Sequence, residues 1–344
     1  MQRLQSSDSI QHLRQTFGSA EEWLFIGCGS SYYIALAAAA TWSMVTGKRA
    51  RAIPASELLL FPDLVFAGSG GIAGVAISRS GLTSETIKAA EFLEREKDIR
   101  TLAITGTSGQ TLEQVTTNTL PLLPFDEKST VMTRSFTSML LGLQFFAAFM
   151  GNDHSFANSL SALPDSTSNT LDDLNPRIAK FVNSRQFADY ICLGQGPFYG
   201  LACETALKIT EMSASYSQSF HTLEFRHGPK SVVSPETLVV FLLSERGYDA
   251  ECDVLEEIKG LGATTLTITN HADNRARRSS DLLVEFGFDL PELARMAPFV
   301  FAGQLIGLHT GLKKGLDPDN PRNLSRVVIL NEEDLPEKAE RAPL

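Results

Sequence analysis

The feature that most limits how this chain can fold is an internal repeat. The offset between its two copies stays nearly constant over most of the sequence. Three pairs of segments carry the repeat: FIGCGSSYY at 25–33 with ICLGQGPFY at 191–199, ISRSG at 77–81 with LSERG at 243–247, and TLAIT at 101–105 with TLTIT at 265–269. A repeat of this length indicates a duplicated domain rather than a solenoid.

Each copy alternates apolar runs typical of buried strands with segments of helical spacing. Strands are expected near 24–28, 50–53, 73–78, 101–105 and 119–123 in the first copy, and near 189–194, 237–243, 264–269 and 282–286 in the second. This alternation predicts two similar α/β domains, each a doubly wound parallel sheet.

The domain boundary is expected within residues 155–180, which are rich in Ser, Asn, Asp and Pro. The predicted domains are 1–160 and 161–330, followed by a solvated tail at 331–344.

Composition limits the possible partners. A net charge of −10 argues against a nucleic-acid or anionic-membrane surface, although a local site can still bind phosphate through N–H donors. Neither a signal peptide nor a membrane span is expected, and no spacing suggests a metal site. The cysteines form no CxxC pair, which favours reduced thiols and a cytoplasmic location; they are Cys28, Cys192, Cys203 and Cys252.

Residues 204–230 concentrate ionisable side chains in an apolar region. Glu204, Lys208 and Glu211 recur at i, i+4 and i+7, which places them along one stripe of a helix. His227 precedes Gly-Pro, which holds it in a loop. A carboxylate base and a loop histidine suit sugar ring opening followed by proton transfer. A solvated charged stripe with a structural histidine explains the same spacing equally well.

Two hydroxyl-rich turns are candidate phosphate sites. Residues 27–31, GCGSS, follow a strand and open a helix, but Tyr32 breaks a dinucleotide fingerprint. Residues 78–86, SRSGLTSET, gather several hydroxyls and Arg79 at a helix start. That set suits a phosphate monoester, whereas simple N-capping needs one hydroxyl.

Two further segments stay open to more than one interpretation. Residues 127–137, EKSTVMTRSFT, are either a capped helix start or a lid over a sugar. Residues 317–326, DPDNPRNLSR, are expected to be an extended surface segment, and two arginines near its end allow a functional role. His309 is expected to be a core or interface residue rather than a ligand.

Taken together and in order, these motifs resemble the sugar isomerase (SIS) family, most closely the isomerase half of glucosamine-6-phosphate synthase and its stand-alone relatives. The resemblance covers roughly residues 20–330 and rests on GCGSSYY, ISRSGLTSET, EKSTVMTRSFT, ETALKITE, EFRHGPK and DNPRNLSR. It implies two tandem SIS domains, a sugar-phosphate substrate and no cofactor. It also implies a homodimer in which His227 reaches the neighbouring subunit's site.

Carried over residue by residue, the resemblance implies roles for most of the candidates. Glu211 would be the enolisation base and His227 the ring-opening histidine, with Glu204 and Lys208 in support. The implied phosphate pocket is Ser31, Ser78, Ser80 and Thr83, with Ser30 and Arg79 beside it; Thr133 and Arg326 are implied as further substrate contacts.

Three departures from the synthase shape the functional expectation. The glutaminase domain is missing, so the chain is not expected to use glutamine by itself. The synthase's Schiff-base lysine falls on Arg326, whose guanidinium cannot be that nucleophile. Arg79 replaces a neutral amide. The expected function is glucosamine-6-phosphate deaminase/isomerase; alternatives are a fructosamine-6-phosphate deglycase, a ketose/aldose-6-phosphate isomerase or a sugar-phosphate sensor.

Overall fold

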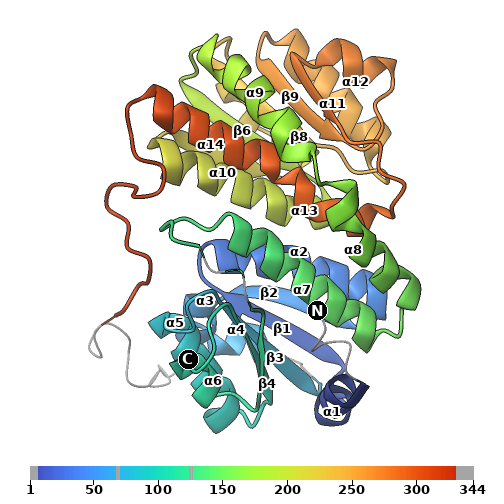
Figure 1. The fold of residues 1–344 in the computed structure, drawn as a ribbon, viewed down its shortest axis with the longest axis vertical. Helices are drawn as coiled ribbons and strands as arrows, with labels where there is room; N and C mark the ends of the chain where they lie inside the picture. The colour runs from blue at the N-terminus through green and yellow to red at the C-terminus, as the bar shows by residue number, and fades with distance from the viewer. Residues whose placement is uncertain (1–6, 67–69, 124, 126, 331–344) are drawn as a thin grey trace. The chain divides into compact units, whose positions relative to one another are not determined.

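The computed structural model describes residues 7–66, 70–123, 125 and 127–330 (Figure 1). The described chain divides into two compact units. The first comprises the described residues of Met1–Glu127, Arg134–Gly151 and Ser325–Leu344, and the second comprises Lys128–Thr133 and Asn152–Leu324. The predicted tail at 331–344 lies outside the described residues.

The first unit is built on a parallel five-stranded sheet of order β2-β1-β3-β4-β5. Its strands are β1 (Glu22–Gly27), β2 (Arg49–Pro54), β3 (Ile72–Ser78), β4 (Thr101–Thr105) and β5 (Asn118–Pro121). Its helices are α1 (Ser7–Phe17), α2 (Ser30–Thr46), α3 (Ala55–Leu60), α4 (Pro62–Phe66), α5 (Ser84–Glu91), the π-helix η1 (Phe92–Glu96), α6 (Thr111–Gln114) and α7 (Arg134–Met150).

One part of the core of this unit lies between the sheet and the paired helices α2 and α7 (Figure 1), and another packs residues of α3 and α5 against the sheet. Every residue of β1 is buried, as expected for a central parallel strand covered on both faces. Trp23 of β1 stacks at a ring-centroid distance of 4.2 Å on Trp42 of α2, which lies 5.0 Å from Phe146 of α7. These large rings hold the two helices against the first strand.

The second unit has the same sheet, of order β7-β6-β8-β9-β10, again all parallel. Its strands are β6 (Asp189–Gly194), β7 (Tyr216–Phe220), β8 (Thr237–Leu242), β9 (Thr264–Thr269) and β10 (Leu282–Glu285). Its helices are α8 (His154–Ser166), α9 (Thr170–Asn183), η2 (Gly196–Phe198), α10 (Tyr199–Ser213), η3 (Glu224–Arg226), η4 (Pro229–Val232), α11 (Tyr248–Gly260), α12 (Asn274–Ser279), η5 (Glu292–Arg295), α13 (Met296–Phe299) and α14 (Phe301–Lys313).

The matching strand orders confirm two tandem doubly wound α/β domains related by duplication. All nine predicted strands are present, but β7 was not predicted. Its sequence, YSQSF, has two serines and a glutamine, a polar composition that does not predict a strand. It is an edge strand that pairs only with β6 among the described residues, and such a strand can remain polar. The repeat itself was the missed signal, because β7 occupies the place of β2.

The segment in which the boundary was expected is helical rather than irregular. Residues 155–180 fall mostly within α8 and α9, each of which contains an internal proline. Apolar residues at helical spacing, including Leu174, Ile178 and Phe181, are buried and stabilise α9 despite its polar composition. Residues 317–324, by contrast, form no helix or strand, as expected.

Among the described residues, no helix combines the length and apolar character needed to cross a membrane.

Candidate active site

Two loops of the first unit leave neighbouring strands at the same edge of the sheet. Strands β1 and β3 are hydrogen-bonded in parallel register, with Ile26 opposite Ala76, and β2 lies on the other side of β1. Their carboxyl ends therefore flank the switch point at which doubly wound sheets bind ligands. The loop after β1 touches the first turn of α5, the helix that follows the second loop, because the Cys28 Sγ lies 3.6 Å from the Thr86 Oγ1.

The loop after β1 carries Ser30 and Ser31 into the first turn of α2. Gly29 adopts φ +53°, a left-handed conformation that lets the chain turn sharply into the helix. Both serines are buried. Burial raises the pKa of the neighbouring Cys28 thiol to about 11, so this cysteine stays protonated at neutral pH.

The loop after β3, residues 78–83, is called the β3 loop below. Its turn is fixed by Gly81, at φ +67°, whose N–H donates to the Ser78 Oγ at 3.1 Å. The Leu82 N–H donates to the Ser80 Oγ at 3.2 Å. Thr83 holds the N-cap position of α5 but makes no side-chain capping bond; its hydroxyl lies 3.3 Å from that of Ser78. Simple N-capping therefore does not account for these hydroxyls.

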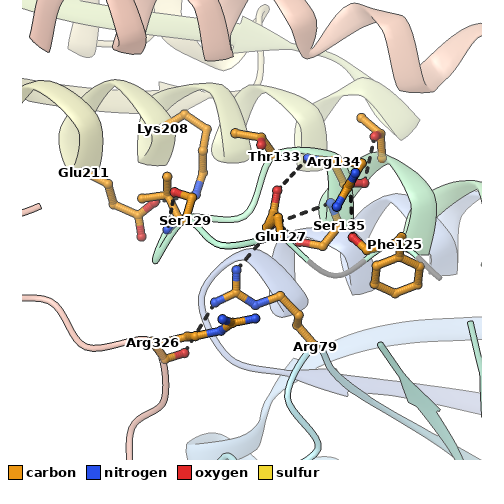
Figure 2. A network of polar contacts seen from close by, with 12 residues as sticks. Arg79, Phe125, Glu127, Ser129, Thr133, Arg134, Ser135, Lys208, Glu211 and Arg326 are labelled. Atoms are coloured by element: carbon orange, nitrogen blue, oxygen red, sulfur yellow. Dashed lines mark hydrogen bonds and ion pairs between the residues drawn. The ribbon is translucent and has the colours of Figure 1, made fainter. Parts of the chain in front are cut away.

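The Arg79 side chain points toward Glu127 (Figure 2). The Arg79 Nη1 lies 3.5 Å from the Glu127 Oε1, and the Arg79 Nη2 donates to the Arg326 carbonyl at 3.5 Å. The Arg326 residue itself is exposed, in the extended segment expected there.

Glu204, Lys208 and Glu211, called the α10 row below, lie on α10 of the second unit as their spacing predicts. The Lys208 Nζ donates to the Glu211 carboxylate and lies 3.5 Å from the Glu204 Oε1. The side chains of Glu204 and Lys208 are 0% and 1% exposed, whereas that of Glu211 is 19% exposed. A solvated stripe is therefore excluded, since only the Glu211 end of the row reaches solvent.

Helix α14 packs closely against the backbone of α10. A Cβ atom on Gly307 would lie 2.7 Å from the Lys208 carbonyl oxygen, so only glycine permits the observed approach of the two helices. Burying an ammonium is costly unless it is paired, and Lys208 has two carboxylates on its own helix.

His227 lies on an exposed loop between η3 and η4. Its backbone N–H donates to the Glu224 carbonyl at 2.9 Å, and Gly228 follows at φ +125°. The residues on either side, Arg226 and Lys230, both donate to the Glu257 carboxylate of α11. This carboxylate ties the two sides of the histidine loop together.

Thr133, the remaining candidate, accepts a bond of 3.4 Å from the Gln304 Nε2 through its carbonyl. It belongs to the second unit with the α10 row and His227, whereas the serines, Thr83, Arg79 and Arg326 belong to the first. Within the described residues, no group of three His, Cys, Asp or Glu side chains is arranged to hold a metal ion.

Sequence reasoning assigned no role to two carboxylates that organise these groups, Glu127 and Glu257. Their partners Arg79 and Arg226 lie 48 and 31 residues away in sequence, a separation that no local pattern reveals.

Comparison with known proteins assigns the chain to a class. The SIS domain family model matches residues 17–149 and 190–286, which together exceed half of the sequence. The chain therefore belongs to the SIS domain family.

Its relatives carry the names of several activities. The glutamine–fructose-6-phosphate aminotransferases (isomerizing) of Methanothermobacter thermautotrophicus and Pyrobaculum aerophilum are 24% and 28% identical over 94% and 93% of this chain. The chain spans about half of their length, 54% and 53%. Glucosamine-6-phosphate deaminase from Thermotoga maritima is 27% identical, with a TM-score of 0.76 over 94% of this chain and 98% of that one. Tagatose-6-phosphate ketose/aldose isomerase from Escherichia coli, 23% identical, shares the fold, with a TM-score of 0.77 over 94% and 90% of the two chains.

Proposed function

We propose that this protein is a phosphosugar isomerase that deaminates glucosamine-6-phosphate to fructose-6-phosphate and ammonia. The observation that carries the proposal is the α10 row, in which a buried ammonium directs a partly exposed carboxylate, that of Glu211. A positioned carboxylate of this kind is what proton abstraction next to a carbonyl requires. The 27% identity to a glucosamine-6-phosphate deaminase over nearly the whole chain supports the choice of substrate.

The proposed chemistry begins with ring opening. His227 takes the proton from O1 and returns a proton to O5, which frees the C1 aldehyde. Glu211 then removes the proton from C2 while O1 takes up a proton from water, which gives a cis-enolamine. Glu211 delivers its proton to C1, and the nitrogen returns a proton to water. The product is the C2 imine of fructose-6-phosphate, and water hydrolyses it to the ketose and ammonia. Each step is a proton transfer or a hydrolysis.

The β3 loop and the loop after β1 would hold the substrate's phosphate. Ser31, Ser78, Ser80 and Thr83 supply hydroxyls at the carboxyl edge of the sheet, and α5 presents its N-terminus there. Binding energy from this remote group would fix C1 and C2 against the base. Thr133 and Arg326 remain further candidate contacts to the sugar.

A coupled assay for ammonia and fructose-6-phosphate tests the proposal directly, with glucosamine-6-phosphate, galactosamine-6-phosphate and a fructosamine-6-phosphate as substrates. We expect both products from glucosamine-6-phosphate. Turnover of the fructosamine-6-phosphate alone would identify a deglycase, and ketose/aldose conversion without ammonia a plain isomerase. Binding without any turnover would identify a sensor and overturn the proposal.

Glu211→Gln provides the residue-level test, because it removes the base while keeping the shape of the side chain. We expect it to abolish turnover and to leave sugar-phosphate binding intact. The matched control is Glu256→Gln on α11, an exposed carboxylate paired with Arg275, which should retain full activity. A near-normal rate in Glu211→Gln would contradict the assignment of the base.

The proposal includes a homodimer in which His227 serves the partner's site. Mixing inactive Glu211→Gln and His227→Asn proteins under exchange conditions would then create hybrid dimers with one intact site. At random pairing, we expect about a quarter of wild-type activity to return. If the mixture stays inactive although subunits exchange, His227 acts within its own chain.

A further inference from the structure

Arg79 is the second residue of the β3 loop. Phosphate binding by this loop does not explain the direction in which the Arg79 side chain points. Its side chain is only 6% exposed. The guanidinium faces the Glu127 carboxylate at 3.5 Å and the Arg326 carbonyl at 3.5 Å (Figure 2). A strong cation therefore lies beside a phosphate site while being directed at a carboxylate of its own chain.

Glu127 is itself fully engaged in structure. Its side chain is 9% exposed. Besides the Arg79 guanidinium, its carboxylate accepts the Arg134 N–H at 3.0 Å, the Ser135 N–H at 3.3 Å and the Ser135 hydroxyl. These donors form the first turn of α7, where a carboxylate is favoured by the unpaired N–H groups and by the helix dipole. One buried carboxylate thus joins the β3 loop to the start of a core helix.

The same carboxylate also fixes the ends of a segment that carries a candidate residue. The chain departs from the first unit after Glu127 and returns to it at Arg134, with residues 128–133, including Thr133, in between. Because Glu127 accepts the Arg134 N–H, the two ends of this segment are held together.

The charge of Glu127 limits whether Arg79 can turn toward a bound phosphate. If the guanidinium turned to the substrate phosphate, the Glu127 carboxylate would lose its ion pair with Arg79, and removing one partner of a buried ion pair is strongly destabilising. The phosphate has other donors in this loop, since hydroxyls and the N-terminus of α5 bind anions without a formal charge.

We propose that Arg79 is a positioning residue, which acts through Glu127 to hold the β3 loop, and is not a ligand of the phosphate. This inference rests on the proposed function, in which the β3 loop binds that phosphate. It implies that Arg79 and Glu127 depend on each other, so that the loop tolerates the loss of both charges better than the loss of either.

The test is a double-mutant cycle on phosphate binding. Arg79→Gln, Glu127→Gln and the double variant are compared with wild type by calorimetric titration of inorganic phosphate and of fructose-6-phosphate. We expect each single variant to weaken binding by about tenfold, because the buried ion pair loses one partner, and the double variant to return to within about threefold of wild type. Gln at position 127 keeps an oxygen that can accept the Arg134 N–H, so α7 retains its cap.

The cycle separates positioning from direct contact. A direct ligand would show weaker binding in Arg79→Gln, no loss in Glu127→Gln, and no recovery in the double variant; that pattern overturns the inference. Unchanged binding in all three variants overturns it as well. If the wild type binds no sugar phosphate at all, the proposed function fails and takes this inference with it, whereas normal wild-type binding with the wrong pattern removes only the inference.

The matched control is the ion pair of Arg51 with Glu22, another nearly buried carboxylate in the same unit, 4% exposed. Arg51→Gln and its double variant with Glu22→Gln should change the stability of the unit while leaving phosphate binding at the wild-type level. Equal weakening there would show that any lost pair disturbs the loop, and would count against a specific role for Arg79.

Discussion

The two repeats have the same backbone turn after their third strand, but the side chains around the two turns differ in their partners and charge. In the β3 loop the Gly81 N–H donates to the Ser78 Oγ at 3.1 Å, and in the equivalent loop after β8 the Gly247 N–H donates to the Ser244 Oγ at 2.9 Å. The backbone scaffold of the turn has therefore survived in both copies.

The two equivalent serines, Ser78 and Ser244, have different hydrogen-bond partners. In the second repeat, the Glu251 carboxylate of α11 accepts both the Ser244 N–H, at 3.1 Å, and the Ser244 hydroxyl. At the aligned position in the first repeat, Glu85 interacts with the Cys28 thiol at 3.9 Å, and Ser78 faces Thr83. An internal carboxylate thus takes the place in the second repeat that a bound anion would need.

The ion pairs beside the loops also have opposite polarity. Arg79 of the first loop pairs with Glu127, whereas the aligned Glu245 of the second pairs with Arg295. A loop that presents acidic groups repels phosphate, so the comparison supports one phosphate site per chain, in the first repeat.

The largest expected effect comes from a substitution that introduces into the β3 loop an acidic residue found at the aligned position of the second repeat. Thr83 aligns with Asp249, so Thr83→Asp places a carboxylate at the proposed phosphate site. Repulsion between close like charges should weaken phosphate binding by at least about a hundredfold. Titration with inorganic phosphate measures this loss. The reciprocal Asp249→Thr variant is the control, and equal affinity in Thr83→Asp and wild type would remove the phosphate from this loop.

The buried carboxylate of the second loop should make stability depend on pH. Burial, aided by the nearby Glu292 charge, raises the pKa of Glu251 from 4.5 to about 7. The folded protein then binds more protons than the unfolded chain between these values. The associated stability is fully present below about pH 4.5 and is lost as pH rises through about 7.

Glu251→Gln should abolish this dependence, because the amide does not titrate and can still bond to Ser244. Relative to wild type, its free energy of unfolding should be higher near neutral and alkaline pH, by at most about 3 kcal/mol. Urea unfolding across this pH range measures the difference, with Glu256→Gln on the same helix as control. Parallel pH profiles for wild type and Glu251→Gln would contradict the prediction.

The two equivalent serines should separate binding from stability. Ser78→Ala should weaken phosphate binding by about tenfold, because it removes one hydroxyl donor from the site. Ser244→Ala should instead lower the free energy of unfolding by about 1–2 kcal/mol, since Glu251 stays buried with one partner fewer. Phosphate titration and chemical unfolding of both variants test this contrast, and it fails if Ser244→Ala also weakens binding.

The smallest expected effect concerns the ion pairs of Glu257 in the second repeat, which lie beside His227. Glu257→Gln weakens the clamp on Arg226 and Lys230, on either side of His227. Because these ion pairs are partly exposed, we expect only a few-fold fall in kcat with the cyclic substrate. Glu256→Gln, one residue away, should leave kcat unchanged. Identical rates in the two variants would show that the clamp does not position His227.

Much of the fold follows from local pattern alone. The apolar strands and the i, i+4, i+7 spacing of Glu204, Lys208 and Glu211 are readable in sequence because each depends on residues close together in the chain. The hydroxyls of the β3 loop are equally local. The repeat is readable because its two copies can be compared segment by segment. Strand β7 and the helices α8 and α9 were missed because their polar composition is overruled by strand pairing in one case and by a buried apolar face in the other.

Periodicity and ordered motifs were enough to predict the duplicated α/β architecture, the family and the candidate residues, since these patterns can be recognised without any knowledge of packing. Packing was needed to show that the Glu251 carboxylate bonds to Ser244 in the second of the two equivalent loops, and that Arg79 faces Glu127 (Figure 2). Such pairings depend on distance and burial between residues far apart in sequence. The same type of side chain can bind a ligand, cap a helix or pair with another residue of the chain. The fold decides between these roles because it determines which opposite charge lies near that side chain.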